Sequence, residues 1–405
     1  MIQPYLVNLV LVFTALVFPA YCPSWTENLG TAINPGIESD NSPLFFPAPG
    51  SPIPLGGPPG NILMGDVNGD GKQDLVASVG RDHSIVILLG NGRGTFVPAV
   101  SSPLRFDVAF GEMGLADFNG DKNLDLALAS HDSYNVTVLL GNGKGGFTPA
   151  PGSPFPAGQG KKPHTHGLVV GDVNRDGKTD IITANNEDGN IAVLLGDGKG
   201  GFLRASGSPF RVGPGPYPIG LGDINGDDRL DVVAPNTVSN GTVTVLLGDG
   251  KGAFTAAPAS PASVVARPYY VAIGDLDGNG KPDIAVAHDD TSQVSVLLGD
   301  GKGRFRPAPG SLLDVGHRGF AIVLTDMNGD GKRDLVEATN SDVTVLLGDG
   351  RGRFQPAPGS PYPAGPGAWR LTVGDIDGDG QPDIAASNLE GNSITLLIRA
   401  HARSR

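Results

Sequence analysis

The sequence predicts an all-β fold: a seven-bladed β-propeller of four-stranded blades, closed by an N-terminal strand that completes the last blade. Three observations predict it. One pattern of about 50 residues recurs seven times. Each copy alternates apolar segments with an Asp-rich loop, a polar loop and a Gly-rich turn. Gly (62) and Pro (35) are abundant beside 39% hydrophobic residues, which indicates many turns around a core.

Each copy predicts four strands. In the fourth copy, YPIGLGD leads into the loop INGDDRLD, and VVAP, TVTVLLG, DGKGAF and TAAPASP follow. The third segment is nearly continuous in apolar residues, as expected of a strand buried between neighbouring blades. The dipeptide after it, such as Asn91-Gly92, is typical of a tight hairpin. Prolines in the fourth segment, such as Pro149 and Pro154, predict an outer edge strand.

The two ends of the array complement each other. The last copy stops at LLIRAHARSR without a Gly-rich turn or a fourth strand. Residues Phe46 to Pro52, FPAPGSP, match the fourth-strand segment FTPAPGSP that begins at Phe147. We therefore expect the N-terminal strand to close the ring, which removes free strand edges and favours a monomer.

The Asp-rich loop predicts a calcium site. In the first copy, Asp66, Asn68, Asp70 and Asp74 stand at positions 1, 3, 5 and 9, with Gly71 at position 6. Calcium takes six to eight oxygen ligands, and alternate positions of a curled loop point side chains at one centre. Position 12 is Ala77 and strands flank the loop, which excludes an EF-hand. A single copy is also compatible with a simple turn. Seven copies at fixed spacing favour up to seven structural Ca²⁺.

The expected ligands occupy the same four positions in every copy. They are Asp66, Asn68, Asp70, Asp74, Asp117, Asn119, Asp121, Asp125, Asp172, Asn174, Asp176, Asp180, Asp223, Asn225, Asp227, Asp231, Asp275, Asp277, Asn279, Asp283, Asp326, Asn328, Asp330, Asp334, Asp375, Asp377, Asp379 and Asp383. At position 6, Lys122 replaces Gly, which disfavours a left-handed backbone and brings a positive charge near the cation. We expect this second loop to be the weakest site, whereas Asp228 should tolerate the conformation better.

These residues resemble a known family. The segments DVNGDGKQDLVAS with VILLGNGRGTF, and DIDGDGQPDIAASN with SITLL, look like the FG-GAP/VCBS-type repeats of integrin α-chain propellers and bacterial surface proteins. The resemblance covers about residues 44–399. It implies calcium loops on one face with a structural role, and ligands met on the opposite face. Such families include adhesion proteins and accessory domains of polysaccharide lyases, so the resemblance does not name a ligand.

The opposite face offers a candidate ligand site. The sixth residue before the first Asp of each loop is Gly in the first two copies and aromatic or His in the other five: His166, Tyr217, Tyr269, Phe320 and Trp369. We expect these rings around the channel mouth, with Arg267, Tyr270, Arg318 and Arg370 beside them, where they suit a sugar or a peptide. Alternatively they cap the hydrophobic layer between blades. A metal or acid–base site among His131, His164, His166 and His288 is disfavoured, because histidines in solvated loops usually serve neither role.

Composition limits the location and partners. A net charge of −13 without a basic cluster excludes a nucleic-acid partner. Residues 1–21 read as a signal peptide or membrane anchor, 22–43 as a linker, 44–399 as the propeller and 400–405 as a basic tail. No other membrane span is expected. Cys22 is the single cysteine, so no intramolecular disulfide is possible. We expect a secreted or cell-surface protein.

The expected function is binding or adhesion, with an extracellular protein or glycan as partner. No nucleophile motif, phosphate loop or zinc signature occurs in the sequence, so an enzyme is not expected. Two alternatives stay open: a structural surface protein without a small ligand, and a polysaccharide-active, lyase-like enzyme.

Overall fold

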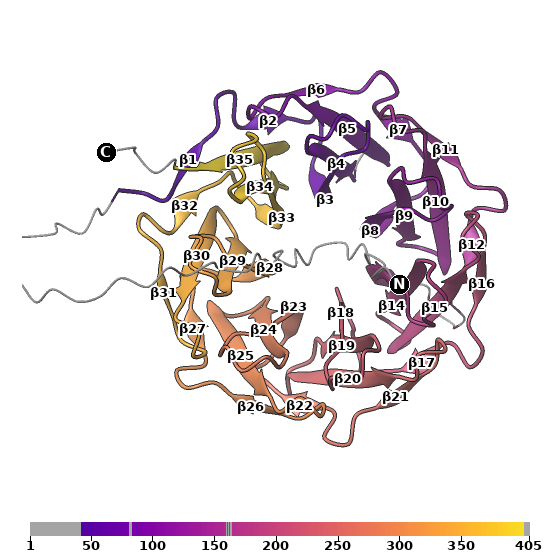
Figure 1. Cartoon of the computed structure of the whole chain (residues 1–405), viewed down its shortest axis with the longest axis vertical. Helices are drawn as coiled ribbons and strands as arrows, with labels where there is room; N and C mark the ends of the chain where they lie inside the picture. The colour runs from indigo at the N-terminus through magenta and orange to yellow at the C-terminus, as the bar shows by residue number, and fades with distance from the viewer. Residues whose placement is uncertain (1–41, 81–82, 159, 161, 163, 401–405) are drawn as a thin grey trace, which may run out of the picture.

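Seven β-sheets form a closed ring (Figure 1). The computed structural model describes residues 42–400 except 81, 82, 159, 161 and 163. These residues form strands and turns with no helix among them, and no helix of the length and apolarity needed to cross a membrane occurs in this part of the chain. The predicted seven-bladed propeller is therefore confirmed. The predicted signal peptide or anchor, most of the linker and the end of the basic tail lie outside the described residues.

Every blade has the same antiparallel order, with its first strand nearest the centre (Figure 1). The innermost strands are β3 (Pro59–Gly65), β8 (Phe110–Ala116), β13 (Thr165–Gly171), β18 (Gly220–Gly222), β23 (Pro268–Gly274), β28 (Gly319–Thr325) and β33 (Ala368–Gly374). The second strands are β4 (Asp74–Val79), β9 (Asp125–Ser130), β14 (Asp180–Asn185), β19 (Asp231–Asn236), β24 (Asp283–His288), β29 (Asp334–Thr339) and β34 (Asp383–Asn388). All residues of these second strands are buried, because the strand has neighbours in its sheet and a blade on each face.

The third strands are the long apolar segments recognised in the sequence. They are β5 (Ser84–Gly90), β10 (Asn135–Gly141), β15 (Asn190–Gly196), β20 (Thr242–Gly248), β25 (Gln293–Gly299), β30 (Asp342–Gly348) and β35 (Ser393–Arg399). The outer strands are β6 (Phe96–Pro98), β11 (Phe147–Pro149), β16 (Phe202–Arg204), β21 (Phe254–Ala256), β26 (Phe305–Pro307), β31 (Phe354–Pro356) and β1 (Phe45–Pro47). Proline recurs in this outer strand, as at Pro98 and Pro149, where fewest N–H donors are needed. Pro235, inside the second strand β19, is an exception.

The outer strand is interrupted and then resumes as a two-residue segment on the same third strand. These segments are β7 (Leu104–Arg105), β12 (Phe155–Pro156), β17 (Phe210–Arg211), β22 (Ala262–Ser263), β27 (Leu313–Asp314), β32 (Tyr362–Pro363) and β2 (Ile53–Pro54). At each interruption a serine Oγ accepts a hydrogen bond from a third-strand N–H, as Ser102 does from Ile87 at 3.0 Å. The same bond recurs in the other six blades. A side chain therefore replaces the missing ladder bond.

The core consists of seven hydrophobic clusters, one at each junction between neighbouring blades. The junction between the last and first blades is built like the others, with Ile62 and Leu75 packing near Ile376 and Leu396. No blade can bury its apolar faces alone, so the ring must close for all seven junctions to exist.

Closure by the N-terminal strand is confirmed. In β1, Phe45 pairs with Arg399 and Pro47 with Leu397 of β35 (Figure 1). Phe45 is buried against Tyr362, with ring centroids 5.3 Å apart. β2 pairs with the other end of β35, Ile53 opposite Ile394. The last blade thus takes its outer edge from residues that precede the first blade.

The turn after the third strand differs from the predicted two-residue hairpin. In the first blade, Asn91 N–H donates to Thr95 O at 3.0 Å, so the turn is longer. Gly92 and Gly94 both have positive φ, 65° and 79°. The Asn91 side chain accepts from Arg93 N–H at 2.8 Å. The dipeptide therefore marks the turn correctly, but Asn serves as a side-chain acceptor in a wider loop.

Candidate functional site

The Asp at position 1 organises the backbone of each Asp-rich loop. In the first loop, Asp66 Oδ1 accepts from Gly69 N–H and Asp66 Oδ2 from Gly71 N–H, both at 2.7 Å. Gly69 and Gly71 have φ of 75° and 80°, a left-handed conformation that Gly adopts without strain. The loop is thus curled tightly around its first carboxylate, which brings positions 1, 3 and 5 to one side.

The second loop keeps this shape despite Lys122. That residue adopts φ of 72°, and its N–H donates to Asp117 Oδ2 at 2.8 Å, as Gly71 does in the first loop. Asp228 in the fourth loop behaves in the same way, with φ of 62°. The strain expected at position 6 is therefore present in both loops, while the loop geometry is retained.

The Asp at position 9 clamps each loop to its blade. Asp74 is fully buried; its Oδ2 accepts from Val67 N–H at 3.0 Å and its Oδ1 from Gly90 N–H at 2.8 Å. Both bonds recur in all seven blades. A Cβ on Gly90 would lie 2.0 Å from Gln73 O, which favours glycine at this position. In the seventh blade Arg399 takes its place. Each carboxylate oxygen retains a second lone pair for a cation.

Charge within the loop favours a cation. Burial raises the pKa of the position-9 carboxyl, to about 7 in Asp180 and to about 6 in Asp125, Asp231, Asp283, Asp334 and Asp383. The two backbone N–H groups lower it, and the carboxylates at positions 1 and 5 raise it further. Three carboxylates around one point repel one another, and a divalent cation between them would remove that repulsion.

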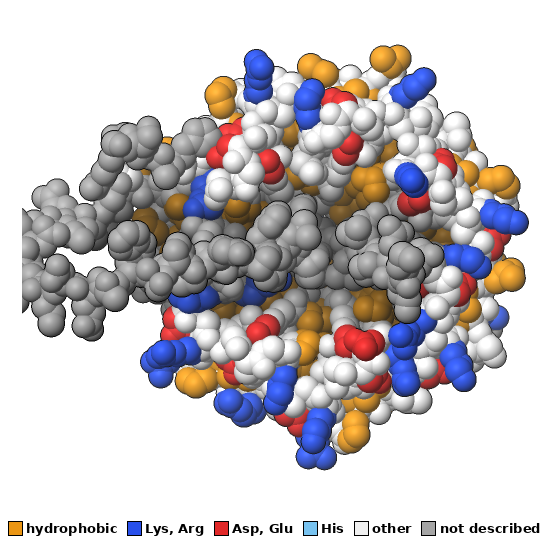
Figure 2. All heavy atoms as spheres, in the orientation of Figure 1, with side chains coloured by type: hydrophobic (Ala, Val, Ile, Leu, Met, Phe, Trp, Pro, Cys, Tyr) orange, Lys and Arg blue, Asp and Glu red, His pale blue; other side chains and the backbone are white. Residues whose placement is uncertain are grey.

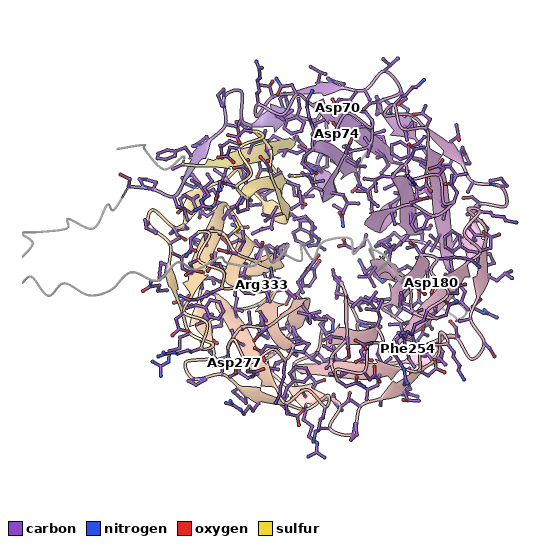
Figure 3. All side chains as sticks on the ribbon, viewed as in Figure 1. Asp70, Asp74, Asp180, Phe254, Asp277 and Arg333 are labelled. Carbon is purple, nitrogen blue, oxygen red and sulfur yellow. The ribbon has the colours of Figure 1, made fainter. Side chains whose placement is uncertain are left out.

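The donor set fits Ca²⁺. In the fifth loop, carboxylate oxygens of Asp275, Asp277 and Asp283 lie within 4.8 Å of one another. The same holds in the seventh loop, for Asp375, Asp377 and Asp383. Oxygen-only donors on a curled loop are what calcium prefers. Figure 3 marks Asp70, Asp180 and Asp277 in three different blades, which shows how the loops are spread around the ring.

The loops also join neighbouring blades. The carbonyl of position 2 accepts an N–H from the Gly-rich turn of the next blade, as Val67 O does from Gly145 at 3.0 Å and Leu276 O from Gly352 at 2.9 Å. The last blade has no such turn, and there the guanidinium of Arg399 donates to Asn328 O at 2.6 Å. Ordering a loop should therefore also stiffen a junction between blades.

The five predicted ligand residues lie at the far end of the inner strands from these loops. The separation follows from β23, which runs from Pro268, next to Tyr269, to Gly274, next to Asp275. Strand rise makes this about 20 Å, so the two sets belong to opposite faces. The predicted division of the faces is thus consistent with the strand directions.

The five side chains form one continuous arc, which we call the aromatic arc. Centroid distances are 4.5 Å for His166–Tyr217, 4.6 Å for Tyr217–Tyr269, 6.1 Å for Tyr269–Phe320 and 4.5 Å for the stacked pair Phe320–Trp369. The arc spans the third to seventh blades and stops where Gly60 and Gly111 provide no side chain. It is therefore an arc and not the full ring suggested by the repeat.

The aromatic arc combines packing with exposure. Tyr269 and Phe320 are buried, which matches the alternative that these rings cap the layer between blades. His166, Tyr217 and Trp369 are partly exposed. Arg318 lies over the Phe320 ring, with its guanidinium carbon 5.7 Å from the centroid. The surface available to a ligand is therefore carried by three of the five predicted residues.

A buried ion pair crosses the channel beneath the arc. Arg370 Nε donates to Glu112 Oε1 at 2.9 Å, and Arg370 Nη1 donates to Phe320 O at 2.7 Å. The guanidinium also lies over the rings of Tyr269, Tyr270 and Trp369. The pair borders a cavity of about 150 Å³ whose walls are mainly aliphatic. The sequence pointed to Arg370 but missed Glu112, which stands at the same strand position in the second blade.

The histidines divide into two kinds. His288, expected in a loop, is instead the last residue of β24 and fully buried; its Nε2 lies 2.9 Å from Ser295 Oγ and its Nδ1 2.9 Å from Ala266 O. His131, His164 and His166 are partly exposed and lie together where the second and third blades meet. Burial and the nearby His164, His131 and Arg370 lower the pKa of His166 to about 3, so its ring is neutral near pH 7.

Charge on the face shown in Figure 2 is dispersed. Figure 2 shows Asp and Glu side chains spread around the ring among Lys and Arg side chains, without one basic patch on the face in view. At the aromatic face, Arg267 forms a bidentate ion pair with Asp289, at 2.7 and 2.6 Å.

Solved structures of the same fold have little sequence in common with this chain. A lectin of Agrocybe aegerita that recognises non-reducing terminal N-acetylglucosamine is 20% identical, with a TM-score of 0.52 over 83% of this chain and 86% of the lectin. BBS1N, solved in complex with ARL6DN, is 14% identical, with a TM-score of 0.61 over 90% and 98%. Virginiamycin B lyase from Staphylococcus aureus, solved with quinupristin, is 12% identical, with a TM-score of 0.53 over 86% and 98%.

Sequence comparison identifies the repeat. No curated protein sequence matches the chain. A model of the FG-GAP-like repeat matches residues 66–127, 117–183, 172–234, 236–286, 275–337 and 326–386, which together cover more than half of the chain. With seven blades, each carrying the Asp-rich loop of that repeat, the protein belongs to the FG-GAP-like repeat family.

Proposed function

We propose that this propeller is a calcium-stabilised binding module that acts outside the cell as a monomer and takes a glycan or a protein at the aromatic arc. The arc is the observation that carries the proposal. The partly exposed rings of Tyr217 and Trp369 lie at the channel mouth, and the guanidinium of Arg318 lies over Phe320, which stacks on Trp369. Aromatic faces with polar groups beside them suit sugar rings and extended peptides.

Calcium has a structural role in this proposal. Side-chain oxygens at positions 1, 3, 5 and 9 of each loop would hold one Ca²⁺, and the ion would neutralise the crowded carboxylates. Because the loops and the aromatic arc lie at opposite ends of the inner strands, the cation would not touch the ligand. Its effect on binding would come through the rigidity of the blades.

The extracellular location rests on sequence features. Tyr5 to Ala20 is an apolar run of the kind found in signal peptides, and the single Cys22 requires no disulfide. Extracellular calcium would keep such loops loaded, because loops of extracellular modules bind in the range of about 10⁻⁴ to 10⁻³ M.

Two other functions differ in what they predict. Neighbours of the same fold include a lectin and a propeller bound to a protein, which favours binding, and a lyase, which keeps an enzyme among the alternatives. A structural surface protein would bind no small ligand. Fold alone does not choose among them, because propellers host unrelated functions.

The experiment is a binding screen of the calcium-loaded protein against glycans and extracellular matrix proteins. We expect a saturable ligand whose binding is lost in Trp369→Ala and Tyr217→Ala. Leu203→Ala is the matched control, because Leu203 is an exposed apolar residue on an outer strand, away from the arc. Binding that survives both arc substitutions would contradict the assignment of the arc. Release of product from a polymer would instead support an enzyme.

A further inference from the structure

The Nε2 atoms of three histidines from two blades lie close together. His131 lies in the connection between β9 and β10, while His164 and His166 lie at the start of β13. His164 Nε2 is 3.0 Å from His131 Nε2 and 2.7 Å from His166 Nε2. All three ligand atoms fall within 4.8 Å of one another. Three Nε2 atoms bound tetrahedrally to Zn²⁺ would be about 3.3 Å apart, so the observed spacing is close to that of a metal site.

Hydrogen bonding alone does not satisfy this cluster. His131 Nδ1 is 2.7 Å from the Asp132 carboxylate, which can only accept, so Nδ1 carries the hydrogen and Nε2 of the neutral ring has a lone pair. His164 Nε2 then contacts two nitrogens but offers at most one hydrogen or one lone pair. One of its two contacts is therefore not a hydrogen bond. A cation that accepts all three lone pairs satisfies the whole cluster.

The surroundings match those of metal-binding histidines. Metal ligands usually donate their other ring nitrogen to a carboxylate, which fixes the ring and increases its basicity. Asp132 does this for His131, and Glu187 Oε1 lies 3.8 Å from His164 Nδ1. The His166 ring packs on Tyr217 and is held by that contact. Side chains of His131 and His164 remain about one-third exposed, which leaves a path for an ion.

We propose that His131, His164 and His166 bind one divalent transition-metal ion of the Zn²⁺ class through their Nε2 atoms. Imidazole nitrogen selects such ions, whereas Ca²⁺ prefers the oxygen-only loops on the opposite face. The protein supplies three ligands, and a water or a donor atom from a bound molecule completes the shell. The ion links the second blade to the third at the margin of the aromatic arc. The site stands independently of any ligand at Trp369.

The test uses the full chain without a histidine tag, in excess Ca²⁺ so that the oxygen loops are filled. Zn²⁺ is titrated in competition with a chromophoric chelator, and Co²⁺ replaces it to record visible ligand-field bands. We expect one Zn²⁺ per chain and the intense bands of a tetrahedral Co²⁺ site. His131→Ala and His164→Ala should each weaken Zn²⁺ binding by at least about 100-fold, and Asp132→Ala by roughly 10-fold.

His317→Ala is the matched control, because His317 is exposed and also faces a carboxylate, Asp342, at 3.9 Å. This variant should bind Zn²⁺ as the unsubstituted protein does. His164→Gln keeps the size and polarity of the side chain and separates loss of the ligand from loss of folding, which the calcium-loaded melt monitors. Absence of a one-equivalent site, or equal affinity in His164→Gln and the unsubstituted protein, would overturn the proposal.

Discussion

Asp74 and its six counterparts bond to groups that lie far from them in sequence. The sequence identified them as calcium ligands from their spacing, and the structure adds a second role, because each carboxylate also holds two backbone N–H groups. One donor, Gly90, is separated from Asp74 by the whole second and third strands. A loop motif cannot reveal that bond, although the glycine that ends six of the seven third strands is a visible sign of close backbone approach.

This double role predicts a difference between positions 5 and 9. Asp74→Ala should destabilise the protein by roughly 2–4 kcal/mol even with a chelator present, because two buried N–H groups lose their acceptor. Asp70→Ala, at an exposed position, should cost little without Ca²⁺ and lower stability only in its presence. Chemical denaturation of both variants with and without Ca²⁺ measures this. If both variants lost the same unfolding free energy with a chelator present, Asp74 would have no role in stability beyond binding Ca²⁺, contrary to this account.

Glu337 is a second residue whose environment the sequence did not reveal. It is fully buried in β29 with neither carboxylate oxygen hydrogen-bonded. Burial raises its pKa well above the usual range. The folded state therefore holds a proton that the unfolded state releases, so this residue makes stability fall as pH rises above the unfolded pKa.

We predict that Glu337→Leu stabilises the protein at pH 7 by on the order of 1–3 kcal/mol, and by less near pH 4. Thr183→Val is the matched control: Thr183 occupies the same strand position in the third blade and also has an unpartnered buried oxygen. Its effect should not depend on pH between 4 and 8. A pH-independent effect of Glu337→Leu would show that the carboxyl is not the cause.

At the scale of elements, the repeat predicted the number and order of the strands in each blade. It did not predict the burial of some of their side chains. His288 was expected in the loop between the second and third strands, in the place that corresponds to His131. Its counterparts at the end of the second strands include Asn236 and Asn388, which are buried and donate to third-strand hydroxyls, as His288 contacts Ser295. An alignment of the last residues of the second strands would have indicated a buried polar side chain with a hydroxyl partner on the neighbouring third strand. The histidine cluster, in contrast, joins two blades, and a single repeat carries no signal for it.

The Asp-rich loops should differ in calcium affinity. The second loop keeps the common backbone only by holding Lys122 at positive φ. Asp117→Ala should therefore reduce Ca²⁺-dependent stabilisation less than Asp66→Ala. Melting temperatures of both variants across a Ca²⁺ titration provide the measurement. The variant Lys122→Gly should increase the Ca²⁺ affinity of the second loop. An unchanged affinity would contradict the idea that backbone strain at Lys122 weakens this site.

The N-terminal strand gives a prediction about closure. Removing residues 44–54 deletes β1 and β2, exposes the edge of β35 and uncovers the pocket that Phe45 fills. We expect aggregation or a strongly lowered melting temperature, because an unpaired edge invites pairing with another chain. A chain that begins at residue 42 is the control. A truncated protein that stays monomeric with an unchanged melt would contradict the closure account.

At the scale of the whole molecule, the fold was predictable because seven copies of one pattern agree. Turn residues, apolar strands and the match between the two chain ends all specify a closed ring. The aromatic arc was predicted as a set, but the burial of Tyr269 and Phe320 was not. Burial there depends on Arg370 and Glu112, which meet across the channel from blades far apart in sequence. An alignment of the repeats does not show which residues of distant blades contact one another across the ring.

The most direct test of the account is the dependence of thermal stability on calcium. Each loop that binds Ca²⁺ only in the folded state adds about 2.7 kcal/mol when Ca²⁺ is a hundredfold above its dissociation constant. Chelation should therefore lower the melting temperature by on the order of 10 °C, since several loops lose their ion together. Added Ca²⁺ should restore it, and an equal concentration of Mg²⁺ should not. A melting temperature unchanged by the chelator would contradict the central claim that the seven Asp-rich loops are calcium sites that stabilise the propeller.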